Sequence, residues 1–238
     1  MSTLLLIRHG QASYGAADYD VLSERGQRQA EALGVYLARQ RLDALYTGPL
    51  RRQVGTAEAV RIAVGAGAPG LEVIDELAEY PAFELLARLL PRLAAGDPEL
   101  MRLASGERGP DGARLMDRAL DAAIGAWSRG ELAADLDGVE SFADFERRVR
   151  AGLDRVLRGH GGGQRVAIVT SGGPIAIAMK LSLGLDPDGA MKLGRAIRNA
   201  SLSEFRWRSQ GFAWAPGELS LYGFNHVHHL PDDLVTYR

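Results

Sequence analysis

The chain has 238 residues, of which 46% are hydrophobic and 24% are charged. This length suits one large α/β domain, or one domain with a sizeable insertion, and the composition is ordinary for a soluble globular protein. The formal net charge of −2 argues against a nucleic-acid or anionic-membrane partner, because such partners call for a basic excess. The absence of cysteine excludes disulfides, thiol nucleophiles and cysteine metal sites.

The N-terminal stretch "MSTLLLIRHG" contains an apolar run of only four residues, which ends at Arg8. That run is too short for a signal peptide, and no later stretch approaches the length of a membrane span. We therefore expect a cytoplasmic protein.

The first third of the chain alternates apolar runs with amphipathic segments. The apolar runs predict strands at 3–7, 42–48 and 71–75. Between them the spacing predicts a helix at 24–41, with Ser23 as its N-cap, and a helix at 49–64 that has Pro49 near its first turn. This order of elements indicates a parallel, doubly wound sheet.

From residue 80 to about 138 the sequence carries no strand signal. A leucine stripe at helical spacing predicts one helix: Leu85, Leu86, Leu89, Leu90 and Leu93. A loop at 104–113 and a second helix at 114–127 follow. We interpret 80–138 as a helical insertion that covers one end of the sheet, within a single domain spanning 1–238.

The α/β pattern returns in the last third of the chain. We expect a helix at 141–157 capped by Ser141, a strand at 165–173 and a helix from Pro174. Two further strands are predicted at 201–208 and 218–224.

Polar side chains are delivered to one edge of this sheet by the segments at the ends of four predicted strands. They are Arg8 and His9, Arg52, Glu79, and Ser171. Ligands of open α/β sheets collect at the carboxyl ends of the strands, where these residues would meet. A lone histidine is more often structural, but this convergence favours a functional site.

The residue types at this edge suit phosphoryl transfer. An imidazole such as that of His9 can attack phosphorus and carry the group covalently. Arg8 and Arg52 would bind phosphoryl oxygens as planar forks, while Gly10 and Gly172 would let backbone N–H groups approach closely.

Two further features bear on this chemistry. A helix beginning at Pro174 would add its dipole to phosphate binding, and Glu79 is the candidate general acid for the departing alkoxide. The histidines of "HVHH" (226–229) lack a nearby carboxylate set, so a packing or surface role is expected for them rather than metal binding.

A set of motifs extends in order across nearly the whole chain. They are "LIRHG" (6–10), "LSERGQRQA" (22–30), "TGPLRRQVGTA" (47–57), "LAEY" (77–80), "ESFADFERRV" (140–149), "VTSGG" (169–173) and "RNAS" (198–201). Together they resemble the histidine phosphatase superfamily, which includes phosphoglycerate mutases and many broad phosphatases.

The resemblance implies a three-layer α/β/α fold with a mostly parallel, doubly wound sheet, in which 80–138 is the substrate-shaping lid. It implies His9 as the phosphorylated nucleophile, Arg8 and Arg52 as phosphate ligands and Glu79 as the proton donor. It implies a phosphorylated small molecule as partner, and neither a metal nor an organic cofactor.

Arg52 is preferred to Arg51 because the arginine of this family lies four residues before a threonine, here Thr56. The candidate phosphate- or substrate-binding residues are Arg8, Gly10, Gln11, Arg52, Ser171 and Gly172.

Ser171 departs from the family pattern, which has a second histidine at this position. A serine hydroxyl is shorter and neutral, and the loss of one preorganised donor typically costs about 10²–10³ in turnover. Three roles stay open for Ser171: capping the following helix, capping combined with a phosphate contact, and nucleophilic attack. The last is disfavoured, because Val169 stands where a nucleophile elbow needs a small residue.

A second departure lies in the first loop. Gly15 stands where the mutases carry asparagine, and Gln11 where they usually carry glutamate, which counts against a phosphoglycerate mutase. The leading hypothesis is a metal-independent phosphomonoesterase that acts through phospho-His9 and is attenuated by Ser171. The alternatives are a non-catalytic phospho-ligand binder and, third, a mutase.

Overall fold

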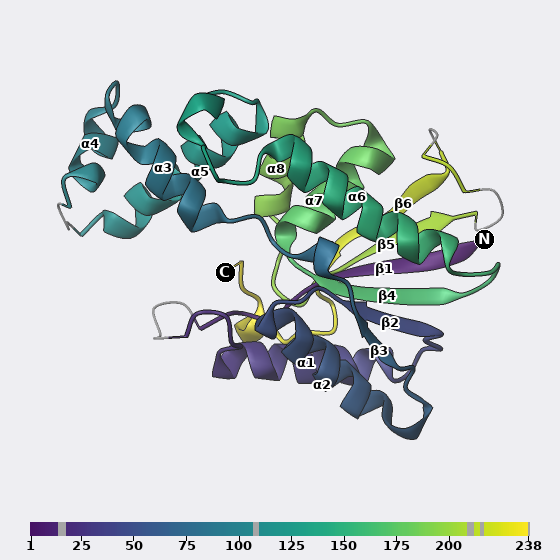
Figure 1. The fold of residues 1–238 in the computed structure, drawn as a ribbon. Coiled ribbons are helices and arrows are strands. Elements are labelled where there is room, and N and C mark those ends of the chain that lie inside the picture. Colours follow the sequence, from purple (N-terminus) through teal and green to yellow (C-terminus); the bar gives the residue numbers. More distant parts are fainter. Residues whose placement is uncertain (14–17, 107–109, 209–211, 215–216, 238) are drawn as a thin grey trace.

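The computed structural model describes residues 1–13, 18–106, 110–208, 212–214 and 217–237. Within these residues six strands form one sheet in the order β3-β2-β4-β1-β5-β6 (Figure 1). The strands are β1 (Ser2–Arg8), β2 (Ala44–Thr47), β3 (Leu71–Val73), β4 (Arg165–Thr170), β5 (Leu202–Trp207) and β6 (Leu219–His226). The first four in this order are parallel, and β5 runs antiparallel to β1 and to β6, so the predicted mostly parallel sheet is confirmed.

Helices cover both faces of the sheet (Figure 1). They include α1 (Glu24–Leu37) and α2 (Arg51–Val64) on one face, and α6 (Phe142–Arg158) and α7 (Gly172–Leu183) on the other. Successive residues of a strand point to opposite faces. Leu5 and Ile7 of β1 therefore pack in the core beneath α1 and α2, whereas Leu4 and Leu6 pack in the core shared with α6 and α7.

Two predicted N-caps are confirmed. The Ser23 hydroxyl accepts a hydrogen bond from the Gly26 amide at the start of α1, and that of Ser141 accepts one from the Asp144 amide at the start of α6. Each satisfies an amide that has no partner within its helix.

Some predicted boundaries are wrong. Helix α1 ends at Leu37 rather than at residue 41, because the following amides bond three residues back and tighten the chain into a turn. Strand β4 ends at Thr170 rather than at residue 173, because α7 begins at Gly172, two residues before Pro174.

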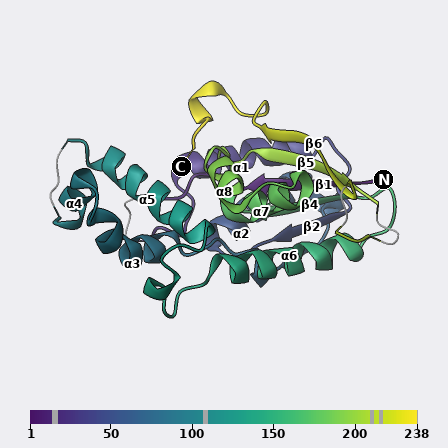
Figure 2. The same ribbon diagram turned by 90° about the horizontal axis from the view of Figure 1, so that it is seen from above.

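The described residues of 80–138 form helices joined by short turns and no strand, in agreement with the predicted helical insertion. It contains α3 (Ala82–Ala94), α4 (Pro98–Ala104) and α5 (Gly112–Ser128), which extend beyond one end of the sheet (Figure 2). The predicted loop at 104–113 lies partly outside the described residues. Buried Trp127 of α5 packs on Tyr80 and on Phe145 of α6, so the apolar core of this lid is continuous with that of the sheet.

Two helices have no counterpart among the sequence predictions, namely α4 and α8 (Pro187–Arg195). The start signal of each was present in the sequence: Asp97 and Asp186 cap the helices, the latter through the Gly189 amide, and a proline occupies the first helical position of both. Short 3-10 helices complete the described secondary structure: η1 (Gly65–Gly67), η2 (Asp75–Leu77), η3 (Ala133–Asp135) and η4 (Asp232–Leu234). None of the described helices has the length and apolar character needed to cross a membrane.

The loop after β1 crosses the first turn of α1 at very short range. A Cβ atom on Gly10 would lie 2.4 Å from the Gly26 carbonyl oxygen, and one on Gly26 would lie 2.0 Å from the Gln11 oxygen. Only glycine permits this approach. The crossing fixes the backbone on the C-terminal side of His9, and the amide of Ala200, in the turn before β5, donates to the His9 carbonyl and holds it from the other side.

Candidate active site

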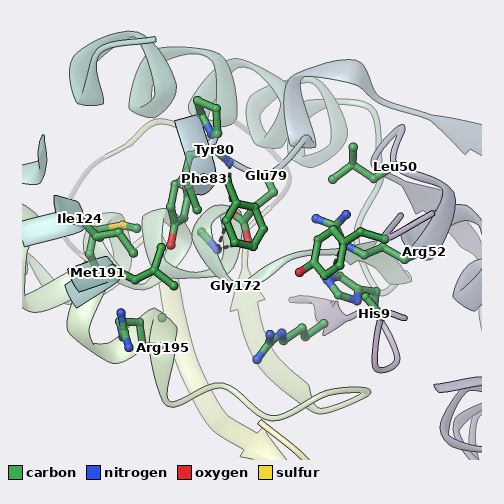
Figure 3. Close-up of a pocket in the computed structure, with 18 of the residues that line it drawn as sticks. His9, Leu50, Arg52, Glu79, Tyr80, Phe83, Ile124, Gly172, Met191 and Arg195 are labelled. Carbon is green, nitrogen blue, oxygen red and sulfur yellow. Dashed lines mark hydrogen bonds between the residues drawn. The ribbon is translucent and has the colours of Figure 1, made fainter. Parts of the chain in front are cut away.

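A pocket of about 490 Å³ lies at the carboxyl ends of β1 and β4, under the lid (Figure 3). Five of the predicted site residues line it: Arg8, His9, Arg52, Glu79 and Gly172. The structure therefore brings together residues from segments that are up to 164 positions apart in the chain. Gly10, Gln11 and Ser171 are not part of this lining.

The His9 ring is held in one tautomer by its two nitrogen contacts. Nδ1 lies 2.6 Å from the Gly10 carbonyl oxygen, which can only accept, so Nδ1 carries the proton. Nε2 accepts a hydrogen bond from Nε of Arg52 at 3.0 Å, so its lone pair points to the guanidinium. The unprotonated nitrogen, Nε2, therefore faces a guanidinium, a group that commonly binds phosphate.

Burial and charge keep this ring neutral. The pKa of His9 lies well below its ordinary value, first because the buried ring loses the hydration of its charged form, and then because Arg52 and Arg8 repel a proton. A neutral imidazole with an unprotonated Nε2 is the form that attacks an electrophile.

Arg8, the last residue of β1, is partly buried and lines the pocket. Its Nη1 donates to the backbone carbonyls of Ile197 and Tyr237, while Nε has no hydrogen-bond partner among the described residues. Burial lowers the pKa of Arg8, although an arginine remains charged at neutral pH. An unpartnered, buried cationic N–H is costly and suits a site that receives an anion.

Arg52, near the start of α2, lies against His9, and Asp20 and Tyr19 hold it there. Its Nη1 is paired with Asp20, and its guanidinium lies over the Tyr19 ring, 5.4 Å from the centroid. Arg51 instead points outward and is paired with Asp18. The choice of Arg52 over Arg51 therefore agrees with their placement, whereas the contacts of Tyr19 and Asp20 had no sequence signal.

Glu79 is anchored at the N-terminus of α7. Its two carboxylate oxygens accept from the Gly173 amide at 3.0 and 3.3 Å, and one of them accepts from the Tyr80 amide at 3.2 Å. Burial raises the pKa of Glu79, and Arg52, this Gly173 bond and Arg8 oppose the rise. The net result is a carboxyl that keeps its proton to higher pH than usual, as a general acid requires.

Arg148 of α6 positions the segment that carries this carboxyl. Its guanidinium donates to the Glu76 and Ala78 carbonyls at 2.9 and 2.8 Å and is paired with Glu140. Sequence reasoning missed this role, although "ESFADFERRV" contains both partners.

The predicted capping of α7 by the Ser171 side chain is wrong. Ser171 occupies the N-cap position, but its hydroxyl makes no cap hydrogen bond. It is completely buried, and its Oγ accepts from Nε2 of Gln53 at 2.8 Å. The long amide side chain of Gln53 outcompetes the local helix amides for this hydroxyl, so the serine is used to join α2 to the turn after β4.

The backbone amides of Gly10 and Gln11 are also engaged inside the protein. The Gly10 N–H donates to Oγ1 of Thr56 at 3.0 Å, and the Gln11 N–H donates to Oε1 of Gln29 at 2.7 Å. Gly172, at the first position of α7, lines the pocket, and its amide has no partner among the described residues. Gly15 lies outside the described residues.

The histidines near the C-terminus lie at the surface or pack against a tyrosine ring. Among the described residues, no three histidine, aspartate or glutamate side chains are grouped so that they could hold a metal ion. His226 and His228 are exposed, and His229 stacks on Tyr36 with ring centroids 5.4 Å apart. This agrees with the expected packing or surface role.

Comparison with known families settles the class to which this site belongs. The model of the histidine phosphatase superfamily (branch 1) matches residues 4–108 and 108–216. The chain belongs to this superfamily. The motifs that carried the resemblance in the sequence, and the phosphoglycerate mutase-like fold, are therefore those of a histidine phosphatase.

Two curated relatives match most of this chain. The chain is 31% identical over 213 residues to the bifunctional protein Rv2228c of Mycobacterium tuberculosis, a match that covers 85% of this chain and 50% of that protein. It is 28% identical to phosphoserine phosphatase 1 of Hydrogenobacter thermophilus, covering 78% of each. The chain thus spans about half the length of the mycobacterial relatives that it matches.

Solved structures share the fold. YhfR of Bacillus stearothermophilus superposes with a TM-score of 0.66 at 22% identity, covering 96% of this chain and 99% of that one. The mycobacterial glucosyl-3-phosphoglycerate phosphatase Rv2419c superposes with a TM-score of 0.62, also at 22% identity, covering 94% and 98%.

Proposed function

We propose that this histidine phosphatase homologue is a metal-independent phosphomonoesterase that works through a phosphohistidine on His9. The observation that carries the proposal is the neutral His9 ring, whose Nε2 lone pair faces the Arg52 guanidinium inside one pocket with Arg8 and Glu79. The phosphatase relatives support the same reaction class.

In the first step Nε2 of His9 attacks phosphorus, and the bond between phosphorus and the ester oxygen breaks. Arg52 then donates to a phosphoryl oxygen in place of Nε2, and with Arg8 it offsets the charge that builds up there. Glu79 transfers its proton to the departing alkoxide. The products are an alcohol, a phosphohistidine and the Glu79 carboxylate.

In the second step water attacks phosphorus, and the bond between phosphorus and Nε2 of His9 breaks. The Glu79 carboxylate takes a proton from the attacking water, which restores the acid, and inorganic phosphate leaves. Gly172, at the first turn of α7, and Arg8 remain as donors to the phosphate oxygens during this step. Gly10 and Gln11 support the loop beneath His9 through the hydrogen bonds of their amides.

The test is hydrolysis of 4-nitrophenyl phosphate in the presence of a metal chelator. We expect turnover by the wild type, and a base-stable, acid-labile phosphoenzyme after rapid alkaline quenching. His9→Ala should abolish both, whereas His228→Ala, which alters an exposed histidine, should abolish neither. Equal turnover by wild type and His9→Ala would overturn the mechanism.

One observation favours a second candidate, a non-catalytic phospho-ligand binder. Ser171, which replaces the family's second histidine, is completely buried, accepts from Gln53 and does not line the pocket. Glu79 argues for catalysis, since a binder has no use for a buried proton donor.

Two variants at this position separate the candidates. Ser171→Ala should change turnover less than about threefold and cost about 1 kcal/mol of stability, because it removes only the bond to Gln53. Ser171→His, which restores a cationic donor, should raise kcat by about 10²-fold. Saturable binding of aryl phosphates without turnover in wild type or Ser171→His would favour the binder.

A further inference from the structure

The pocket extends far beyond the residues that would handle the phosphate. In Figure 3, Ile124, Met191 and Arg195 lie on the side of the pocket opposite His9 and Arg52. A volume of about 490 Å³ is in the range of sites that enclose whole organic molecules. The pocket therefore has room for the organic part of an ester, reaching from the phosphate end toward α8.

The walls between these two ends are apolar. Tyr80 lies between them (Figure 3), and the other apolar contributions come from Phe83 of α3, Ile124 of α5 and Met191 of α8. Ile124 and Met191 are only 5% and 2% exposed, so they form a fixed surface rather than a mobile one. Such walls favour an aliphatic or aromatic spacer, because burying it removes apolar surface from water.

The far end carries a cation that the proposed chemistry does not use. Among the described residues three arginines line the pocket; Arg8 and Arg52 contact or approach His9, whereas Arg195, the last residue of α8, lies opposite. The Arg195 side chain is 27% exposed and is paired with Asp121 of α5, which is 57% exposed. Exposed ion pairs are weak, so a ligand anion can take the place of Asp121.

The charges around Arg195 select the kind of anion. Its guanidinium presents a planar fork that matches a carboxylate. Asp121 is its ion-pair partner, and Glu84 also lines the pocket, so a doubly charged second phosphate would meet acidic side chains with only one cation to balance it. One carboxylate matches the single positive charge.

We propose that Arg195 determines specificity by binding a carboxylate, so that the substrate is a phosphate monoester whose phosphate and carboxylate are separated by an apolar spacer. The proposal rests on the proposed function in one respect: the phosphate occupies the end of the pocket at His9.

The experiment compares two aryl phosphates whose phenols differ only in a carboxylate or an amide at the far end, 3-(4-phosphonooxyphenyl)propionate and its primary amide. Their dissociation constants are measured by calorimetry on the His9→Ala protein, where turnover is excluded. We expect the carboxylate to bind about tenfold to a hundredfold more tightly than the amide, as a charge-assisted hydrogen bond provides. Arg195→Met in this background should bring the ratio close to one, and Arg195→Lys should restore part of it.

Two further variants keep the test sharp. Lys192→Met changes an exposed cation on the same helix, paired with Asp188, and should leave the ratio unchanged. Asp121→Asn releases Arg195 from its ion pair and should raise the ratio, which tests the proposal even when Arg195→Met fails to fold. A ratio near one in the parent, an equal ratio in Arg195→Met, or no measurable binding of the carboxylate ester would overturn it.

Hydrolysis of the two esters by the wild type tests the phosphatase proposal separately from the role of Arg195. Hydrolysis of both esters supports the phosphatase proposal, and hydrolysis of neither overturns it. A carboxylate preference that persists in binding without hydrolysis would still support the role of Arg195, so the two failures are distinguishable.

Discussion

His9 and Glu79 have pKa values displaced in opposite directions from similar surroundings. Both are buried at the same pocket, and burial disfavours the charged form of each. For the imidazole this means loss of a proton, and for the carboxyl it means retention of one. Burial therefore favours a neutral His9 ring and lets Glu79 keep its proton to higher pH than an ordinary glutamate, which are the directions that the proposed first step needs.

These directions predict the shape of the pH profile of kcat/KM. Protonation of His9 removes the nucleophile, and because its pKa is lowered, the acid limb should lie below pH 6.5. Deprotonation of Glu79 removes the acid, and because its pKa is raised, the alkaline limb should lie above that of an ordinary glutamate. Glu79→Gln should lose the alkaline limb and about 10²–10⁴ of kcat/KM on an alkyl phosphate.

Two controls belong to this prediction. Glu84→Gln removes a charge from the same pocket but from an exposed position on α3, and it should keep the alkaline limb. A 4-nitrophenyl ester, whose leaving group needs little protonation, should lose less than the alkyl ester in Glu79→Gln. An alkaline limb that survives in Glu79→Gln would assign the acid to another group.

At the scale of single elements, the connection from β4 to α7 requires a glycine at position 173, because the side chains of Glu79 and Tyr80 occupy the space that a Cβ atom would need. A Cβ on Gly173 would lie 2.1 Å from Oε1 of Glu79 and 2.6 Å from the Tyr80 ring. Those atoms belong to the proposed proton donor and to the wall of the pocket, so the absence of a side chain at Gly173 is what lets Glu79 bond to the start of α7.

Gly173→Ala should therefore displace Glu79 from its amide partner and lower kcat/KM on an alkyl phosphate by about 10²-fold or more. Gly112→Ala, at the first residue of α5 with open space around it, is the matched control and should have wild-type kinetics. Steady-state kinetics and the melting temperature of both variants check this. Wild-type kinetics in a folded Gly173→Ala protein would mean that Glu79 is not the acid.

The elements also show which parts of the site the sequence could predict. Arg8 and His9 follow a strand that is buried on both faces, so their place at its carboxyl end followed from the apolar run alone. The bond from Gln53 to Ser171 did not, because it joins residues 118 positions apart that meet only when α2 packs on the sheet. Sequence showed that a serine stood at the turn, but not which partner would take its hydroxyl.

For the whole molecule, layer architecture was predictable because each layer has its own periodicity. The alternating faces of β1 and the amphipathic helices on both sides follow from apolar patterning. The return of the C-terminal segment to the site was not predictable. Nε2 of Gln29 donates to the Leu234 carbonyl, and Arg8 donates to the Tyr237 carbonyl. Both acceptors are backbone atoms, which every residue type has, so the sequence does not indicate these contacts.

That returning segment contains His229, which makes the stability of the fold depend on pH. Neither ring nitrogen of His229 has a hydrogen-bond partner among the described residues. Burial first, and then the neighbouring His228, lower the pKa of His229 to about 4. In the unfolded chain His229 binds a proton near pH 6.5, whereas in the folded chain it binds one only near pH 4.

The contribution of His229 to the free energy of unfolding should therefore be greatest above pH 6.5 and should fall as the pH decreases from 6.5 to 4. His229 contributes at most about 1.4 kcal/mol per pH unit to this slope, reduced by its residual exposure to solvent. Urea unfolding of wild type and His229→Phe from pH 7.5 to 4.5 measures it. Phenylalanine keeps the ring stacked on Tyr36 and cannot take up a proton, so the stability of this variant should fall less on acidification. His228→Gln, at an exposed position, leaves the His229 ring in place and should retain most of the pH dependence of the free energy of unfolding. An equal pH dependence in wild type and His229→Phe would exclude His229 as its source.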